Sequence, residues 1–420
     1  WSLESSDPNL VCNTCAGWEF ATDRSGGTPG RLNSVDADLV DDQAPVFLYF
    51  GYGEPCTIQL HYSEPVLYPG EPPGQVTIQP GALAADSVVA YQPLAERLTC
   101  YFPMDPAALP DFRIHVPGVP DCQGNLSHDL VLPAGAFSAP TFGSVLINEI
   151  MYDPLESTPE YIELYNQGPR FFDLADLAVG VAEGTYPEKL TILSSHSRNF
   201  GPGEYLVLCR DIRHLRDAYG LEISGCWMEV DDLSSLPNTG GTVYLTERSG
   251  NTVDVADYGD RMHMELIGDT RGISLERIAW DRPGFDTGNW HSAASIEGYA
   301  TPGRANSQAL DESGISGILV LEPQVFSPDN DGYNDLLGIS LSTLEQGSVI
   351  RLWITDLAGN PVRSLANNHI TGSTARYVWD GEQDNGEMAR EGIYVVHLRG
   401  YHPVSGRRWN RKTATGVIYH

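Results

Sequence analysis

A seven-residue phrase occurs twice in this chain, as TPGRLNS at 28–34 and as TPGRANS at 301–307. The similarity reaches further back, because Ser2-Leu3-Glu4 corresponds to Ser274-Leu275-Glu276. An apolar strand start followed by a Thr-Pro-Gly turn, in which proline fixes φ and glycine permits a positive φ, is typical of the end of a β-domain. The repeat therefore predicts two domain ends.

The two predicted domain ends differ in what precedes them. Trp18 corresponds to Trp290, and the spacing from the tryptophan to the proline of TPGR differs by one residue between the two copies. A long segment from about Val145 precedes the second end, whereas only the opening residues precede the first. We therefore expect residues 1–35 to be the C-terminal remnant of a first domain. They hold too little apolar surface for a core of their own, so we expect them to pack on upstream chain or on a partner.

The pattern along the chain predicts an all-β protein with several domains. Alternating or β-branched runs bounded by Gly, Pro, Asn and Asp recur throughout, and the chain holds 43 Gly and 29 Pro. Helical periodicity is clearest in RDIRHLRDAYG at 210–220. A length of 420 residues fits two to four domains.

The formal charge of −31 argues against nucleic acid as a partner, since phosphate binding needs a basic face. Residues 1–308 carry a net −27 and residues 309–420 only −4. The closing stretch from Arg399 has five basic side chains and no acid; these are Arg399, Arg407, Arg408, Arg411 and Lys412. This stretch is either a docking surface for an acidic partner or a solvated strand pair.

Seven cysteines in a turn-rich acidic β-protein favour an oxidising compartment. Alternation places Cys56 and Cys100 toward one core, so we predict a disulfide between them, and a second between Cys209 and Cys226. Three alternatives are open for Cys12-Asn-Thr-Cys15: a local disulfide, two unlinked thiols, or part of a zinc site. No apolar run approaches the 18 residues of a membrane helix.

The sequence contains none of the common catalytic signatures, and its histidines lack ligand spacing. We interpret paired carboxylates such as Glu160 and Glu163 as strand-edge and turn acids. One stretch, DNDGYND at 329–335, has the spacing of a calcium loop, with oxygen donors around a glycine. The candidate ligands are Asp329, Asp331, Asn334 and Asp335. The alternative is a network of Asx turns that caps backbone amides.

Two segments resemble known β-sandwich families. Residues 36–140 contain YSEPV at 62–66 and GVPDCQGN at 118–125, and this segment resembles bacterial immunoglobulin-like domains. Residues 141–308 resemble the lamin tail domain, an immunoglobulin-like sandwich found in nuclear lamins and in many bacterial secreted proteins. The residues that carry this second resemblance are INEI at 147–150, EYIELYN at 160–166, DL at 173–174, GEYLVL at 203–208, LPN at 236–238, GG at 240–241, LER at 275–277, Trp290 and TPGRANS. Because TPGRLNS repeats this ending, the resemblance implies that residues 1–35 are the C-terminal remnant of a first lamin-tail-like domain.

Residues 309–420 contain SPDNDGYND at 327–335, DLAG at 356–359, WDG at 379–381 and GIY at 392–394. This segment resembles the C-terminal immunoglobulin-like domains of gliding-motility-associated and type IX-secreted proteins of Bacteroidota. The resemblance implies an address that an outer-membrane component of the type IX secretion system reads. The fold expected for the whole chain is therefore a series of tandem immunoglobulin-like β-sandwiches.

These observations favour the non-catalytic C-terminal region of a large exported protein, at the cell surface or in the medium. Its sandwiches would be spacer or adhesion modules, and its partners would be an export component and the upstream part of the same polypeptide. The alternative is the accessory region of a secreted hydrolase, a nuclease or phosphoesterase, whose catalytic domain lies upstream.

Overall fold

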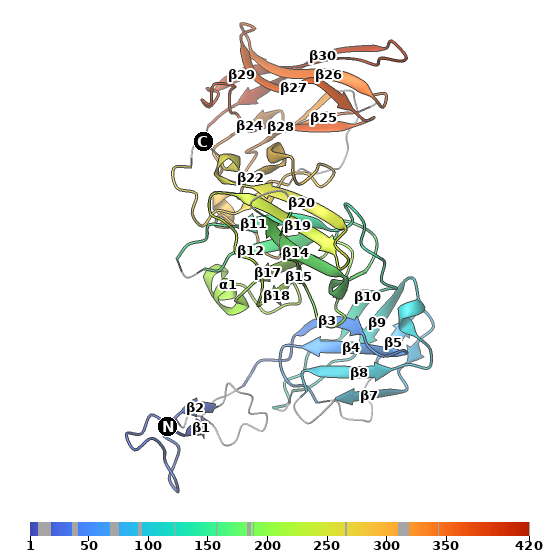
Figure 1. The fold of residues 1–420 in the computed structure, drawn as a ribbon, viewed down its shortest axis with the longest axis vertical. Helices are drawn as coiled ribbons and strands as arrows, with labels where there is room; N and C mark the ends of the chain where they lie inside the picture. The colour runs from blue at the N-terminus through green and yellow to red at the C-terminus, as the bar shows by residue number, and fades with distance from the viewer. Residues whose placement is uncertain are drawn as a thin grey trace.

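The computed structural model describes residues 1–6, 18–35, 41–67, 75–90, 95–121, 123–156, 158–182, 186–187, 189–264, 267–309, 319–342 and 344–419. Strands dominate this part of the chain, and three two-sheet bodies follow one another along its long axis (Figure 1). A small hairpin of β1 (Leu3–Ser5) and β2 (Trp18–Phe20) lies at one end of the array. The predicted fold class, all-β with tandem sandwiches, is confirmed.

The first sandwich contains two antiparallel sheets, in the orders β3-β4-β8-β7 and β10-β9-β5-β6. Because successive residues of a strand face opposite sides, alternate side chains such as Ile58, Leu60 and Leu98 enter the shared core. The strands are β3 (Phe47–Tyr52), β4 (Thr57–Tyr62), β5 (Thr77–Gln79), β6 (Leu83–Ala84), β7 (Ser87–Ala90), β8 (Arg97–Tyr101), β9 (Phe112–Val116) and β10 (Leu130–Ala134).

The second sandwich packs a six-stranded sheet, β18-β17-β12-β11-β21-β22, against a four-stranded sheet, β15-β14-β19-β20. A short pair, β13 with β16, lies beside them. The strands are β11 (Leu146–Met151), β12 (Tyr161–Tyr165), β13 (Phe172–Asp173), β14 (Leu177–Ala182), β15 (Thr191–Ile192), β16 (Asn199–Phe200), β17 (Tyr205–Cys209), β18 (Trp227–Glu229), β19 (Gly241–Glu247), β20 (Thr252–Tyr258), β21 (Leu275–Arg277) and β22 (Trp290–Ser292).

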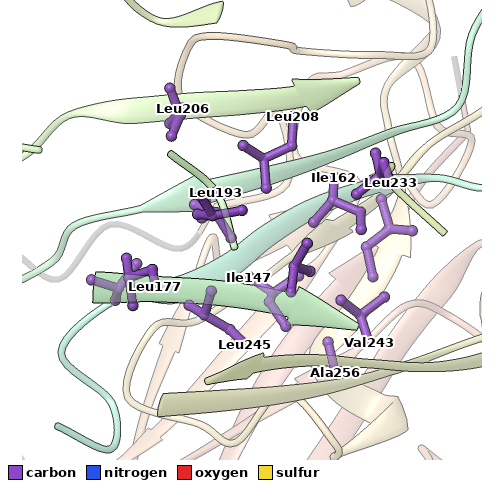
Figure 2. Close-up of a cluster of buried hydrophobic side chains, with 14 of the residues drawn as sticks. Ile147, Ile162, Leu177, Leu193, Leu206, Leu208, Leu233, Val243, Leu245 and Ala256 are labelled. Atoms are coloured by element: carbon purple, nitrogen blue, oxygen red, sulfur yellow. The ribbon is translucent and has the colours of Figure 1, made fainter. Parts of the chain in front are cut away.

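Aliphatic side chains from both sheets fill the core of the second sandwich. Figure 2 shows Ile147, Ile162 and Leu208 of one sheet facing Leu177, Val243 and Leu245 of the other. Each of these six side chains is at most 1% exposed. Burial of this apolar surface is the main stabilising contribution to the sandwich.

The helix predicted at 210–220 is confirmed as α1 (Ile212–Tyr219). The Asp211 side chain caps its N-terminus by accepting a hydrogen bond from the His214 amide, and Gly220 ends it in the left-handed conformation. Leu215 is buried in the core beneath the helix, and Ile212 and Tyr219 pack against the same cluster. Among the described residues, no helix has the length and apolar character needed to cross a membrane.

The third sandwich has one three-stranded sheet, β23-β25-β28, and one five-stranded sheet, β24-β30-β29-β26-β27. Trp379 and Phe326 fill its centre at 1% and 0% exposure. The strands are β23 (Leu319–Glu322), β24 (Val325–Phe326), β25 (Leu337–Leu341), β26 (Ser348–Asp356), β27 (Pro361–Thr371), β28 (Ala375–Trp379), β29 (Gly392–Tyr401) and β30 (Arg408–Val417).

The first and second sandwiches meet along β3. The Phe50 amide donates to Asn199 Oδ1 at 2.9 Å, and the Tyr52 amide donates to Ser197 Oγ at 3.0 Å. Gly51 lies between these two bonds, and a Cβ there would lie 2.1 Å from the Ser197 carbonyl oxygen. The close approach of the two backbones therefore depends on glycine at this position.

We expect Gly51→Ala to open this joint while leaving both sandwiches folded, because the added methyl group must displace the Ser197 backbone. Overpacking of this kind costs about 1–3 kcal/mol. Small-angle X-ray scattering should show a broader distribution of distances between the sandwiches. Gly268→Ala is the matched control, since a Cβ there meets nothing within 4 Å. Identical scattering profiles for the two variants would show that the joint does not depend on Gly51.

Candidate functional site

Three glutamates form a row across the six-stranded sheet of the second sandwich. Glu149 on β11 is the register partner of Glu163 on β12 and of Glu276 on β21. All three are 0% exposed. The interpretation of Glu163 as a strand-edge or turn acid is therefore wrong, because β12 is an interior strand flanked by β11 and β17. We call these three residues the glutamate row.

The segment Thr301–Gln308, which contains TPGRANS and which we call the closing segment, supplies hydrogen-bond donors to the glutamate row. Thr301 Oγ1 lies 3.2 Å from Glu149 Oε2 and 2.6 Å from Glu276 Oε1. Further donors from the segment and its flank are the Thr301 amide to Glu149, the Gly303 amide to Glu163, and the Ser307 hydroxyl and Gln308 amide to Glu276. The repeated phrase thus satisfies buried carboxylates as well as forming a turn.

The glycine of TPGRANS is required by the space it occupies. Gly303 has φ +80°, and a Cβ there would lie 2.9 Å from Trp227 and 3.1 Å from Cys226. A side chain at this position would therefore move the amide that donates to Glu163.

Residues outside the closing segment complete the hydrogen bonding of the row. Tyr161 and Ser274 donate their hydroxyls to Glu149 at 2.6 and 2.5 Å, and Asn148 donates its amide to Glu163 at 2.8 Å. A buried ion pair, Arg277 with Asp254 at 2.6 Å, lies in the same sandwich. The hydrogen-bond donors to the three carboxyl groups are all neutral, and in the described part of the chain no Lys or Arg forms an ion pair with them.

Burial raises the pKa of all three carboxyl groups. The pKa of Glu276 rises to about 7, first because of burial and second because of the charge of Glu149. Burial likewise raises the pKa of Glu149, and burial together with Glu149 raises that of Glu163 well above its usual range. Three adjacent carboxylates without a cation cannot all be ionised at low cost, so the row holds protons near neutral pH. This arrangement is structural, because no side chain of the row reaches solvent.

The predicted calcium loop lies where the second and third sandwiches meet. Asp329, Asp331 and Asp335 can each place one carboxylate oxygen within 4.8 Å of the others. Asn334 has φ +56° and its carbonyl accepts from the Ser327 amide, but its side chain is not part of this group. Three of the four predicted ligands therefore come together, and the cluster can hold a metal ion.

The same loop also forms the alternative that the sequence left open, a network of Asx turns. Asp335 accepts from the Gly332 amide at 2.9 Å, and Asp331 accepts from the Tyr333 amide at 2.8 Å. Gln308 of the closing segment donates to Asp335 at 3.0 Å, and Ser295 donates to the Asn330 carbonyl at 2.7 Å. The loop therefore also joins the two sandwiches.

A second acidic cluster was not predicted. Asp41, Glu64 and Asp121 place carboxylate oxygens within 4.8 Å of one another. Burial raises the pKa of Glu64 to about 7, with the charges of Asp41 and Asp121 as further causes. Glu64 belongs to YSEPV and Asp121 to GVPDCQGN, so the two motifs that carry the immunoglobulin-like resemblance meet here.

The five predicted basic residues lie on or beside β29 and β30. Three share the outward face of the sheet, and the other two have partners of their own. Arg399 is the register partner of Asn410, so Arg399, Arg408 and Lys412 share the outward face of the five-stranded sheet. Arg407 pairs with Glu345 at 3.4 Å, and the Arg411 guanidinium donates to the Asn410 carbonyl at 3.0 Å.

The outward face contains three further residues that the sequence did not single out. Arg351 is the register partner of Arg399, and Trp353 is the register partner of His397. The Trp353 and His397 rings stack at 4.9 Å and 10°, and the Arg351 and Arg399 guanidiniums lie 4.9 and 5.6 Å from the tryptophan ring. Burial, followed by the charges of Lys412 and Arg399, lowers the pKa of His397. We call Arg351, Trp353, His397, Arg399, Arg408 and Lys412 the basic face.

Neither predicted disulfide forms, because Cys56, Cys100, Cys209 and Cys226 are all free. Ile58, not Cys56, is the register partner of Cys100, so the two cysteines do not lie directly opposite each other. In the parallel pairing of β17 with β18, Cys209 is opposite Glu229, which places Cys226 three positions away. Cys12 and Cys15 lie outside the described residues.

A cavity of about 910 Å³ lies between the second and third sandwiches. Its lining includes His263, His291 and His369 together with Asp260, Asp286 and Asp384. Arg261, Arg282 and Arg363 also line the cavity, so groups of both charge signs meet there. None of the three residues of the glutamate row lines it.

Comparisons with known proteins agree with one of the three resemblances. The family model of the lamin tail domain matches residues 138–260, so this domain is present in the second sandwich. The six-stranded sheet extends beyond the matched residues to β22. No curated protein matches the sequence.

Several solved structures are similar to the chain at low identity. The N-terminal part of the bacterial S-layer protein SbsC is 11% identical, with 52% of this chain and 44% of that chain covered and a TM-score of 0.20. Dimeric latent PorU from Porphyromonas gingivalis is 9% identical, with 89% and 33% covered and a TM-score of 0.20. PorZ, described as a surface component of the type IX secretion system of the same organism, is 11% identical, with 89% and 52% covered and a TM-score of 0.17.

The chain spans about half the length of the SbsC structures that it matches. TM-scores near 0.2 describe no shared overall arrangement, so these similarities do not define a function.

The raised pKa of Glu276 predicts that the second sandwich loses stability as the pH rises. The unfolded group titrates near 4.5 and the folded group near 7, so the folded state holds the extra proton between these values. The stabilising contribution of Glu276 is therefore greatest below pH 4.5 and falls as the pH rises to 7, by at most about 3 kcal/mol for a shift of this size. Glu276→Gln removes this titration and should flatten the pH dependence.

Amide hydrogen exchange of β11 and β21 between pH 5 and pH 8, corrected for the intrinsic exchange rate, measures the pH dependence of stability for the second sandwich alone. Glu229→Gln, on an exposed strand position, is the control and should behave like the unmodified chain. An unchanged pH dependence in Glu276→Gln would contradict the assignment of the proton to the glutamate row.

Proposed function

We propose that these residues form a non-catalytic region of a large exported protein of the bacterial cell surface or extracellular medium. The sandwiches act as spacer or adhesion modules, and residues 309–420 act as the sorting signal that an outer-membrane component of the type IX secretion system reads. The observation that carries this proposal is the basic face, which lies on the last sandwich of a chain whose formal charge is −31.

The composition of the sheet supports recognition of an acidic surface. β27, β29 and β30 contain no Asp or Glu, so the cations of the basic face are not neutralised from within these strands. An acidic receptor would attract this face and repel the acidic remainder of the chain, which fixes the orientation of docking. A cationic patch also speeds association by electrostatic steering.

We also propose that the loop at Asp329–Asp335 binds calcium and stiffens the joint between the second and third sandwiches. Three converging carboxylates are the hard oxygen donors that calcium prefers. Their contacts with Gln308 and Ser295 link the candidate ligands to the joint.

Calcium titration tests the loop. Isothermal titration calorimetry with CaCl2 should detect binding to the chain, and Asp331→Asn should weaken it at least tenfold because it removes one charged ligand. Asp217→Asn, an exposed position on α1, is the control and should bind as the unmodified chain does. Equal binding by Asp331→Asn and Asp217→Asn would exclude this loop as the calcium site.

Export of a reporter protein tests whether residues 309–420 act as a sorting signal. Residues 309–420 fused to an inert periplasmic reporter should send it to the surface or medium of a type IX-competent cell. Arg399→Glu should cause retention in the periplasm, because it places a negative charge at the centre of the basic face. Arg390→Glu makes the same charge change at an exposed residue outside the basic face and should leave export unchanged.

Two outcomes would contradict the proposal. Retention of the unmodified fusion, with the domain shown to be folded by circular dichroism, would exclude the sorting role. Export of Arg399→Glu at the level of the unmodified fusion would exclude recognition through the basic face.

A further inference from the structure

We call the contact of β3 and its neighbouring strands with residues 194–199 of the second sandwich the first joint. β3 is an edge strand and lies on the side of the first sandwich that faces the second (Figure 1). The amides of Phe50 and Tyr52 donate across this contact. The Leu48 carbonyl oxygen is also so close to Gly225 that a Cβ there would lie 1.7 Å from it. The two sandwiches are therefore in direct backbone contact, and the side chains between them are partly shielded from water.

Side chains of both sandwiches stack on one another at the first joint. Tyr49 of β3 and His61 of β4 are register partners, and their rings stack at 4.3 Å and 14°. From the second sandwich, the His196 ring lies 5.9 Å from the His61 ring at 21°, and its Nε2 lies 3.0 Å from the Tyr49 hydroxyl. The Arg198 guanidinium lies 4.4 Å from the centre of the Tyr49 ring. The stack therefore spans the joint and holds two histidines and an arginine.

The groups around the His61 ring oppose a positive charge on it. Arg97 of β8 is the register partner of His61. From the second sandwich, His196 and Arg198 lie close to it. Burial, followed by these three basic groups, lowers the pKa of His61 to about 4. Glu96 contributes a negative charge beside the stack. Burial and the three basic neighbours thus keep His61 neutral at pH 7.

Protonation of His61 is costly in the closed joint because its Nε2 is buried and, among the described residues, has no hydrogen-bond partner. In the protonated ring both nitrogens carry hydrogen, so Nε2 would be a charged donor without an acceptor. When the sandwiches separate, the ring regains water and its ordinary pKa near 6.5. The contribution of His61 to closure is therefore complete above pH 6.5 and is lost as the pH falls toward 4.

We propose that the first joint is an acid-sensitive hinge, in which protonation of His61 beside His196, Arg97 and Arg198 releases the first sandwich from the second while both stay folded. Because the proton binds the open joint more tightly, the open population rises by about tenfold between pH 7 and pH 5. The release is reversible, since no covalent bond changes. The first sandwich is thus held against the second at neutral pH and becomes free to rotate in acid.

Amide hydrogen exchange at the first joint tests the hinge. The amides of Phe50 and Tyr52 donate to residues of the second sandwich, so their protection, corrected for the intrinsic exchange rate, measures closure of the joint. We expect this protection to fall by about tenfold from pH 7 to pH 5, while the amide of Leu60 in the core keeps its protection. The glutamate row cannot cause this loss, because its stabilising contribution increases in acid. A parallel loss at Leu60 would show unfolding of the sandwich and would overturn the proposal.

Matched substitutions show whether His61 is the group that responds to acid. His61→Phe keeps a ring in the stack but cannot gain a proton, so the protection of Phe50 and Tyr52 should stay nearly constant between pH 7 and pH 5. His61→Gln repeats the test with a smaller side chain. His128→Phe, at an exposed position before β10, is the control and should behave like the unmodified chain. Equal pH dependence in the His61 variants and in His128→Phe would overturn the assignment to His61.

An NMR titration of the histidine rings measures the same group in the unmodified chain. The His61 ring should titrate well below pH 6.5, over the same pH range in which Phe50 and Tyr52 lose protection. A His61 midpoint at or above pH 6.5 would show that closure of the joint does not disfavour the proton, and it would overturn the proposal.

Discussion

The burial of three adjacent glutamates is the constraint on which the second sandwich depends. Carboxyl groups inside a core cost free energy unless each oxygen has a hydrogen-bond partner. The strands alone do not supply enough donors, and the segment Thr301–Gln308 provides those that remain. The closing segment is therefore part of the hydrogen bonding of the core. This role explains why the Thr, Gly, Asn and Ser of the TPGR-x-NS pattern occur together twice in the sequence.

The sandwiches are joined by specific contacts as well as by linkers. β3 of the first sandwich meets the Ser197–Asn199 segment of the second, and the loop at Asp329–Asp335 meets Gln308 at the end of the closing segment. Gln308 also donates its amide to Glu276, so the glutamate row and the second joint share a residue. Such joints hold each sandwich at a defined position relative to its neighbour, which is what the proposed spacer role requires.

The sequence predicted the elements that depend on local chemistry. Alternation and turn residues identified the β-sandwiches, and helical periodicity identified α1. The predicted disulfide between Cys56 and Cys100 was wrong because pairing depends on strand register, which alternation alone does not define. The register partner of Cys100 is Ile58, not Cys56. The glutamate row was missed because a Glu in a strand was taken to face solvent. Its partners, such as Thr301 with Glu149, are 152 positions apart in the sequence.

The central claim is that the closing segment stabilises buried carboxyl groups that hold protons near neutral pH. The most direct test is an NMR titration of the side-chain carboxyl carbons of Glu149, Glu163 and Glu276. The account predicts that at least one of them titrates near pH 7, and that Thr301→Val shifts this midpoint further upward because it removes a donor to the carboxylates. Midpoints near 4.5 for all three carboxyl groups, or no shift in Thr301→Val, would contradict it.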